Sequence, residues 1–123
     1  TVKQCLTVFP PMLRTLKALP DNMLKAAQKG FINATDLADY LTKKGEPFRS
    51  AYKTTGQIVA YCIANNKVLE EMTLQEYKEF DSQFEADVFE AIDLKRCVES
   101  RISAGGTNQA SADEQIKYIK QFI

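Results

Sequence analysis

Apolar residues recur every three or four positions along most of this chain, a spacing that gathers them on one face of an α-helix. Residues 30–56, GFINATDLADYLTKKGEPFRSAYKTTG, contain one such helical stripe and the start of a second. Leu37, Tyr40 and Leu41 share one helical face, and a second apolar stripe begins after Pro47. Because so few residues separate the two helices, they are predicted to form a helical hairpin. The second stripe comprises Phe48, Ala51, Tyr52, Thr55, Val59, Cys62 and Ile63.

Start and stop residues set the predicted limits of these helices. Gly30 is expected to close the preceding helix in the left-handed conformation. Thr35 or Ala34 is expected to open the next one, and Thr35 is the better cap because its hydroxyl can accept a hydrogen bond. Gly45 is predicted to end that helix, and Pro47 suits the first turn of its successor, where no backbone N–H is needed. The Asn65–Asn66 pair is predicted to end the longer helix.

The N-terminal segment Thr1–Ala18 has a helical pattern with an interruption. Pro10 and Pro11 are expected to kink or break the helix, because neither can donate a backbone hydrogen bond. The apolar pattern starts abruptly, which predicts the end of a longer helix. Pro20 and Asp21 are predicted to form a turn and cap before a short helix. The first apolar face comprises Val2, Cys5, Leu6, Phe9, Leu13 and Leu16, and the short helix carries Met23, Leu24, Ala27 and Phe31.

Three S/T-x-x-E sequences predict helix starts in the second half of the chain, at Thr73, Ser82 and Ser111. Asp93 is predicted to cap a further short helix, and residues 102–110 read as a loop. No stretch alternates as a strand would. The predicted fold class is therefore all-α, a small bundle of about six or seven helices with the helical hairpin at its centre. The helix faces predicted around Ser82, Asp93 and Ser111 are Phe80, Phe84, Val88, Ala91 and Ile92; Leu94, Cys97, Val98 and Arg101; and Ala112, Ile116, Ile119 and Ile123.

The charges balance overall but are unevenly distributed. Lysine plus arginine and aspartate plus glutamate number 16 each, which gives no reason to expect nucleic acid or an anionic membrane as a partner. No apolar run approaches the length of a membrane span. Residues 1–53 hold nine basic and four acidic residues, whereas residues 70–93 hold nine acidic residues and one lysine. The acidic segment is either a docking face or the solvated side of two amphipathic helices.

Side chains suited to catalysis or metal binding are scarce. The chain has no histidine, which removes the commonest general base and the commonest metal ligand. Cys5, Cys62 and Cys97 lie far apart among apolar neighbours, so buried thiols in a reducing cytosol are expected and a zinc site is not.

Two segments are candidates for binding an anion. Residues 103–107, SAGGT, could cradle a phosphate, but they lack the GK[ST] ending of a P-loop and no strand precedes them, so a turn is favoured. Arg49 and Lys53 lie one turn apart near a helix start, and they are either an anion site or a solvated helix face.

Several motifs resemble, in order and spacing, the C-terminal region of the argininosuccinate lyase family, which includes the delta-crystallins and is related to fumarase and aspartase. They are ATDLADYL at 34–41, KKGEPFR at 43–49, TLQE at 73–76 and SAGGT at 103–107. Tyr52 departs from the family, since many members have histidine there. The sequence Phe9-Pro-Pro-Met12 stands where the long central helix of the family usually continues.

The resemblance implies a homotetrameric, cytoplasmic lyase that splits argininosuccinate into arginine and fumarate in arginine biosynthesis. It implies a division into residues 1–18, the end of a long central-bundle helix, and residues 19–123, a C-terminal helical domain. The family's catalytic serine lies in a GSSxMPxKxNP loop and its conserved histidine in another segment, and neither is in these 123 residues. We therefore expect no catalytic, cofactor-binding or metal-binding residue here, no cofactor, and no activity of this segment alone.

The expected partners are the remaining domains of the same enzyme and its homotetramer, with argininosuccinate bound by the whole enzyme only. The alternative is a free-standing helical interaction module derived from the lyase tail, and a storage role of the crystallin kind stays open as a third possibility. The apolar face of the first helix is predicted to drive self-association through residues before Pro10, or to fray.

Overall fold

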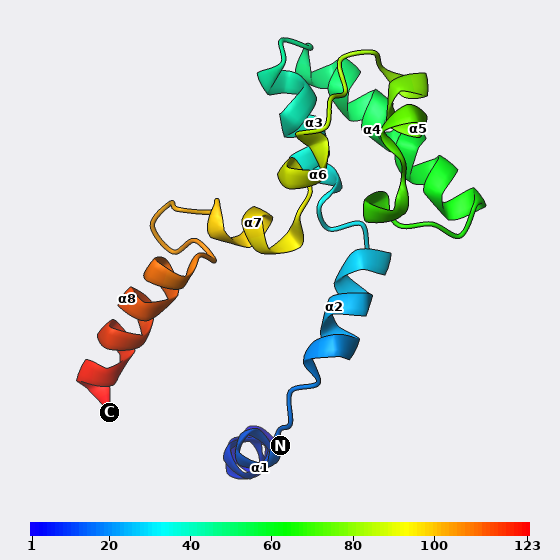
Figure 1. The fold of residues 1–123 in the computed structure, drawn as a ribbon. Coiled ribbons are helices and arrows are strands. Elements are labelled where there is room, and N and C mark those ends of the chain that lie inside the picture. Colours follow the sequence, from blue (N-terminus) through cyan, green and yellow to red (C-terminus); the bar gives the residue numbers. More distant parts are fainter.

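The protein, described here by a computed structural model of residues 1–123, contains eight α-helices, two short 3-10 helices and no strand (Figure 1). This architecture confirms the all-α prediction. None of the helices is both long and apolar enough to cross a membrane. The helices are α1 (Val2–Thr15), α2 (Pro20–Lys29), α3 (Ala34–Lys43), α4 (Phe48–Ala64), α5 (Leu74–Phe80), α6 (Val88–Ala91), α7 (Leu94–Glu99) and α8 (Gln109–Ile119), with the 3-10 helices η1 (Leu69–Glu71) and η2 (Lys120–Phe122).

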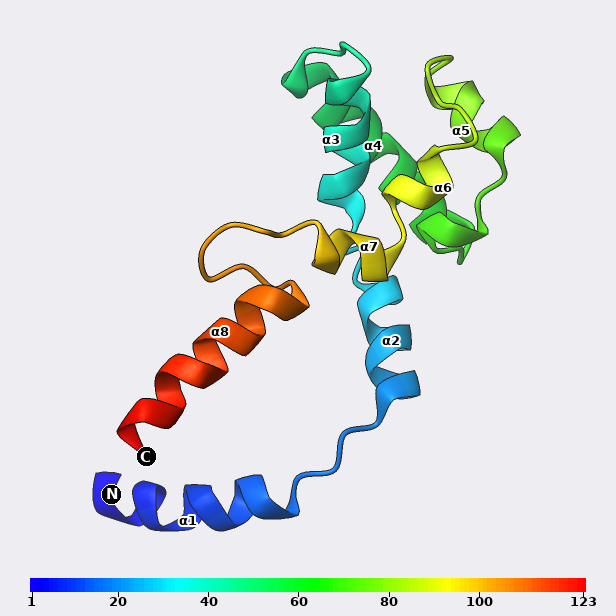
Figure 2. The ribbon, with the colours of Figure 1, turned by 60° about the vertical axis from the view of Figure 1, so that its left-hand side comes forward.

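A single compact core lies between α3, α4, α5 and α6, which cluster together in both views (Figures 1 and 2). Tyr77 and Phe84 are its largest fully buried side chains, and their rings lie 5.0 Å apart. Burying each large apolar side chain stabilises the fold by about 1.5–3 kcal/mol. The core comprises Leu37, Tyr40, Leu41, Ala51, Ile58, Cys62, Leu69, Met72, Tyr77, Phe84, Val88 and Ile92.

Helices α3 and α4 form the predicted hairpin, and they make the most extensive contact between any two helices. Gly45 follows α3 with a φ of +109°. Residues that have a side chain rarely adopt this backbone conformation, so glycine permits the tight connection. Asn65 and Asn66 end α4 as predicted, and Asn66 is left-handed with a φ of +53°. The predicted α4 stripe is only partly correct, because Phe48, Tyr52 and Ile63 are exposed while Ile58, outside the prediction, is buried.

The terminal helices extend away from the core. In both views α1 lies far from the α3–α4 hairpin, and α8 projects from the loop that follows α7 (Figures 1 and 2). Every residue of α1 is exposed, α2 has no buried residue, and α8 buries only Ser111. Of the apolar face predicted for α8, Ala112 is half-buried, Ile116 and Ile119 are largely exposed, and Ile123 lies beyond the end of the helix and is almost fully exposed.

Two predicted details at the start of α3 are wrong. Gly30 is right-handed with a φ of −80°, and the left-handed residue is Phe31, with a φ of +49°. Thr35 does not cap α3, because the helix already begins at Ala34 and Asn33 occupies the cap position. The amide of Asn33 instead donates to the Ile92 carbonyl at 2.8 Å and to Glu70 at 3.1 Å. Long-range contacts with the core thus override the local capping preference.

The prolines of the N-terminal half also differ from expectation. Helix α1 is continuous through Pro10 and Pro11, so the break that was one of the two expected outcomes does not occur. The helix is exposed throughout, and water can reach the carbonyls that these residues leave unbonded. Pro20 is the first residue of α2, and Asp21 lies within the first turn instead of capping it. Pro47 is the N-cap of α4 and lies outside its first turn.

Of the three predicted capping boxes, only the one at Thr73 is correct. The Thr73 hydroxyl accepts from the Glu76 N–H at 3.2 Å, and Glu76 accepts from the Thr73 N–H at 2.8 Å. Ser82 lies in a turn that Asp81 organises by accepting from the Gln83 N–H. Helix α8 is capped by Asn108, whose side chain accepts from the N–H of Ser111 at 3.0 Å. The predicted Asp93 cap of α7 is confirmed.

Candidate functional site

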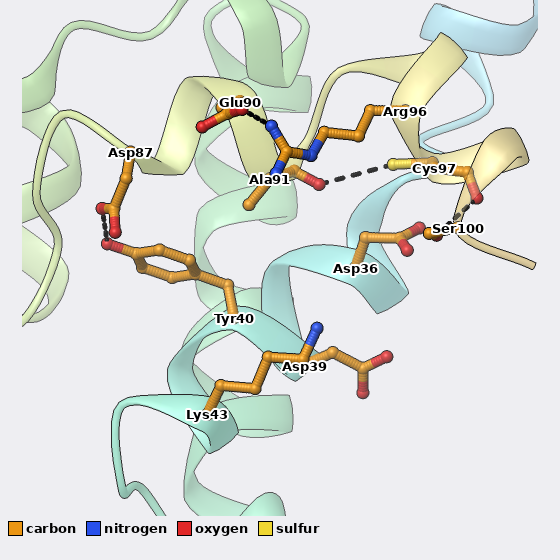
Figure 3. A pocket seen from close by; sticks show the side chains of 10 residues that line it. All are labelled: Asp36, Asp39, Tyr40, Lys43, Asp87, Glu90, Ala91, Arg96, Cys97 and Ser100. Carbon is orange, nitrogen blue, oxygen red and sulfur yellow. Dashed lines mark hydrogen bonds and ion pairs between the residues drawn. The ribbon is translucent and has the colours of Figure 1, made fainter.

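The best-defined polar hollow lies between α3, α6 and α7 and has a volume of about 220 Å³ (Figure 3). Four carboxylates and two basic side chains share its wall. Helix α3 presents its residues at four-residue and three-residue intervals, so they point to one side of the helix toward α6 and α7. The lining residues are Asp36, Asp39, Tyr40, Lys43, Asp87, Glu90, Ala91, Arg96, Cys97 and Ser100.

Tyr40 joins α3 to the segment before α6. Its hydroxyl donates to the Asp87 carboxylate (Figure 3). The same hydroxyl accepts from the Glu85 N–H at 3.1 Å. Lys44 pairs with both Glu85 and Asp87, at 3.1 Å from the latter, and lies 5.2 Å from the centre of the Tyr40 ring. Burial, followed by the hydrogen bond to Asp87, raises the pKa of Tyr40, so this hydroxyl stays protonated.

Two arginines of the α7 region neutralise further carboxylates. Arg96 pairs with Glu90 across the hollow (Figure 3). Arg101 donates to both oxygens of Asp36, at 2.9 and 3.0 Å, and so ties the end of α7 to the start of α3. The carboxylates of the hollow are therefore mostly committed to partners within the chain, and among them only Asp39 makes no ion pair.

The thiol that reaches this hollow is buried and held in its protonated form. Cys97 is 8% exposed, and its Sγ lies 3.5 Å from the carbonyl oxygen of Ala91. Burial and, second, the hydrogen bond with Asp36 raise the pKa of Cys97 to about 12. The nucleophilic thiolate is therefore suppressed at neutral pH. Cys62 is buried as predicted and its pKa is also raised by burial, whereas Cys5 contradicts the prediction and is exposed, because nothing packs on α1.

A second polar cluster links α4 to α5. Glu76 accepts from Lys67 at 2.5 Å and from the Tyr61 hydroxyl at 2.8 Å. It also accepts from the backbone N–H of Thr73, the N-cap of α5. The Lys67 hydrogen bond is the largest of several contributions that lower the pKa of Glu76 to about 2. A carboxylate held so firmly in its charged form is a poor general base, and the cluster serves to fix α5 against α4.

Five of the nine acidic residues in the segment 70–93 either form an ion pair or cap an α-helix within the chain. Glu76, Glu85, Asp87 and Glu90 pair with basic residues from other elements, and Asp93 caps α7. This distribution favours intramolecular ion pairs and solvated helix faces over an acidic docking surface.

Of the two candidate anion sites, the one on α4 is an exposed pair of basic side chains and the one at 103–107 is a closed turn. Arg49 and Lys53 are exposed on α4 and form no ion pair. In the 103–107 loop, Gly106 donates its N–H to Ser103, and a Cβ at Gly106 would lie 2.0 Å from the Arg101 carbonyl oxygen. The loop is therefore a tight turn in which the Gly106 N–H is already bonded to the Ser103 carbonyl. The sequence also favours a turn over a phosphate cradle.

The apolar spacing predicts the buried face that carries Tyr40 but not the polar network around its hydroxyl. A tyrosine within an apolar stripe signals such a network, because a buried phenol hydroxyl needs a hydrogen-bond partner. The partners, Asp87 and Glu85, lie more than 40 residues away and cannot be identified from local spacing.

Comparison with known proteins places these features in a family. The family described as "Argininosuccinate lyase C-terminal" matches residues 31–99, which include α3 to α7. The chain is 46% identical over its whole length to an argininosuccinate lyase of Ruminiclostridium cellulolyticum and 49% identical to that of Acetivibrio thermocellus, covering 27% of each. It is 50% identical over 121 residues to the lyase of Desulforamulus reducens, covering 26% of that protein. The chain spans about a quarter of the length of the curated relatives it matches.

Proposed function

This chain belongs to the argininosuccinate lyase family, and from that premise we propose that it serves as the C-terminal structural domain of an enzyme that splits argininosuccinate into arginine and fumarate. The observation that carries the proposal is the match of all 123 residues, at 46–49% identity, to lyases from two organisms. Arginine biosynthesis in the cytoplasm is the corresponding process and location. No cofactor takes part in the proposed role.

The proposed contribution of these residues is to assembly, and the chemistry belongs elsewhere in the enzyme. The reaction needs one group that removes a Cβ proton and one that protonates the leaving nitrogen. The chain has no histidine, its Cys97 thiol is held protonated, and most of its cleft carboxylates are ion-paired. We propose that argininosuccinate is bound by the whole enzyme only and that this chain alone is inactive.

The exposed apolar face of α1 supports a role in a larger assembly. Leu6, Phe9 and Leu13 share one face of α1 and are 67%, 57% and 53% exposed, and a contiguous exposed apolar face is typical of an interaction site. In the proposed homotetramer, residues 1–18 pack with other helices of a central bundle, and residues 19–123 form the domain at its end.

The proposed inactivity is tested by incubating the purified chain with argininosuccinate and following fumarate by its ultraviolet absorbance. No fumarate above a buffer blank is expected after hours at high protein concentration. Turnover that survives repurification, and that an unrelated protein prepared in parallel lacks, would contradict the assignment of the chemistry to other segments.

A free-standing interaction module is the second candidate, and the self-contained core of α3 to α6 favours it. The reading frame of the gene discriminates the two. A frame that runs upstream into the SSxMPxKxN loop supports the lyase domain, and a methionine start near Thr1 supports the module.

A further inference from the structure

Helix α7 connects the core to the C-terminal residues 102–123, and few contacts hold it in place. Cys97 is its only buried residue. The one helix that packs against α7 through several residues is α6, its neighbour in the sequence. The position of α7 relative to α3, on the other side of the hollow, therefore depends on individual side chains.

One ion pair joins the first turn of α3 to the chain just beyond α7. A single terminal nitrogen of Arg101 donates to both carboxylate oxygens of Asp36, at 2.9 and 3.0 Å. The two residues are 65 positions apart in the sequence. The Asp36 side chain is only 11% exposed, so dissolved salt screens this pair less than it screens a pair on the open surface.

Close packing does not support this ion pair. Figure 3 shows the Asp36 side chain directed from α3 toward α7. Asp36 and Cys97 line two separate hollows, the one of about 220 Å³ described above and another of about 150 Å³ that extends to Thr107. In a core, interlocked side chains fix the elements relative to one another. With a hollow on either side of the α3–α7 junction, the ion pair takes over that role.

The loop after α7 transmits the position of Arg101 to α8. The Gly106 backbone lies so close to Arg101 that a Cβ at Gly106 would be 2.0 Å from the Arg101 carbonyl oxygen. The Gly106 N–H donates to the Ser103 carbonyl at 2.7 Å, and the same carbonyl accepts from the hydroxyl of Ser111 in α8 at 3.4 Å. The start of α8 is therefore tied through this loop to Arg101.

Beyond its first turn, α8 has little to fix its direction. It projects away from the core in both views (Figures 1 and 2), and Ser111 is its only buried residue. It packs through several residues only against η2, which continues it. Segments with so few buried contacts are the ones that move locally. The loop and the ion pair behind it thus determine where α8 lies.

We propose that the Asp36–Arg101 ion pair is a clasp that sets the direction of α8, and that α8 swings about residues 102–108 when the clasp opens. The closed clasp holds the exposed apolar side chains of Ile116, Ile119 and Phe122 at one place relative to the core. Opening it frees this surface to move while the core of α3 to α6 stays intact. The inference goes beyond the proposed lyase role and does not depend on it.

Double electron–electron resonance between two spin labels tests the clasp. Lys53→Cys on α4 and Lys117→Cys on α8 place labels at exposed positions, in a Cys5→Ser background that leaves only the two buried thiols. Dilution with excess unlabelled chain restricts the measurement to distances within one molecule. A single narrow distance distribution is expected for the background, and one at least twofold broader for Arg101→Gln and for Asp36→Asn.

The matched control is Arg96→Gln, which removes a second arginine of the same region and opens its ion pair with Glu90. Its distribution should stay as narrow as that of the background. The double variant Asp36→Asn, Arg101→Gln should be no broader than either single variant, because either change alone already opens the clasp. The thermal unfolding transition, followed by circular dichroism, should be unchanged in all of them.

Four results would overturn the proposal. They are a distribution that is already broad in the background, one that Arg101→Gln leaves narrow, an equal broadening by Arg96→Gln, and a broadening that comes with loss of the unfolding transition. The last result would assign the ion pair to the stability of the core and not to the direction of α8.

Discussion

Tyr40 is the residue at which the polar contacts of the domain converge. It is 7% exposed, its ring stacks 5.8 Å from that of Phe84, and its hydroxyl both donates to Asp87 and accepts from the Glu85 backbone. One side chain thereby holds α3, the core and the segment before α6 in a fixed relation.

Replacing Tyr40 with phenylalanine is expected to destabilise the fold by about 1–2 kcal/mol, because the change removes a hydrogen bond to a carboxylate and leaves the Glu85 N–H without its acceptor. Urea denaturation measures the loss. Tyr52→Phe is the matched control, since Tyr52 is 67% exposed, and its cost should stay below about 0.5 kcal/mol. Equal effects of the two changes would show that the hydroxyl network contributes nothing to stability.

Glu76 gives the fold a defined sensitivity to acid. Hydrogen bonds led by that from Lys67 lower its pKa from 4.5 to about 2 in the folded chain. A lowered pKa means that the stabilisation is fully present above pH 4.5 and is lost as the pH falls toward 2. Glu76→Gln is therefore expected to lower the free energy of unfolding at pH 7 and to flatten its decline between pH 4.5 and 2.

The control for this change is Glu79→Gln, since Glu79 lies on the same helix but is exposed and forms no ion pair. It should leave the acid-induced decline as in the parent chain. Parallel curves for Glu76→Gln and the parent would contradict the role given to Glu76.

At the scale of the helices, local sequence predicts where an element lies better than it predicts how the element ends. The hairpin, the Thr73 and Asp93 caps and the loop before α8 all follow from local rules. Ser82 and Ser111 match the same capping pattern and do not cap, because Asp81 and Asn108 already supply the acceptors. Asn33 cannot be assigned from sequence, since its amide binds Ile92 and Glu70, each more than 35 residues away.

The contrast between the Thr73 and Ser82 sequences is directly measurable. Thr73→Ala is expected to cost about 1 kcal/mol, because it removes the acceptor for the first turn of α5. Ser82→Ala, at the same motif position in a turn, should change stability by no more than about 0.5 kcal/mol. Chemical denaturation of the two variants and the parent measures both costs. A loss of stability at Ser82 equal to that at Thr73 would mean that Ser82 also caps a helix.

At the scale of the whole molecule, the chain combines one closed core with helices that project from it. The core of α3 to α6 is buried by the chain itself. Helices α1, α2 and α8 project from it (Figure 2) and carry exposed apolar side chains. The same apolar spacing predicts both kinds of helix, so sequence periodicity cannot tell which face is covered within the chain. The ion pairs that line the α3–α6–α7 hollow also join residues far apart in the sequence, such as Arg101 with Asp36, and local spacing does not predict them.

The α1 face leads to a prediction about assembly. Phe9→Glu is expected to reduce self-association in light scattering while costing far less than the roughly 3–5 kcal/mol of a truncated core aromatic, because Phe9 is 57% exposed. Phe84→Ala, at a fully buried position, is the contrasting variant and should carry the full cost. A chain that is monomeric at high concentration and loses several kcal/mol on Phe9→Glu would show that α1 closes its own core.

The most direct test of the central claim is to exchange domains with a relative. In the Acetivibrio thermocellus lyase, the segment that aligns with this chain is replaced by these 123 residues, and fumarate release from argininosuccinate is measured beside a lyase truncated at the same point. The domain assignment predicts that the chimaera keeps lyase activity within about tenfold of its parent and that the truncated enzyme, and a chimaera carrying Leu37→Asp in the buried core, lose it. A chimaera that assembles like its parent but releases no fumarate, or a truncated enzyme as active as the chimaera, would contradict it.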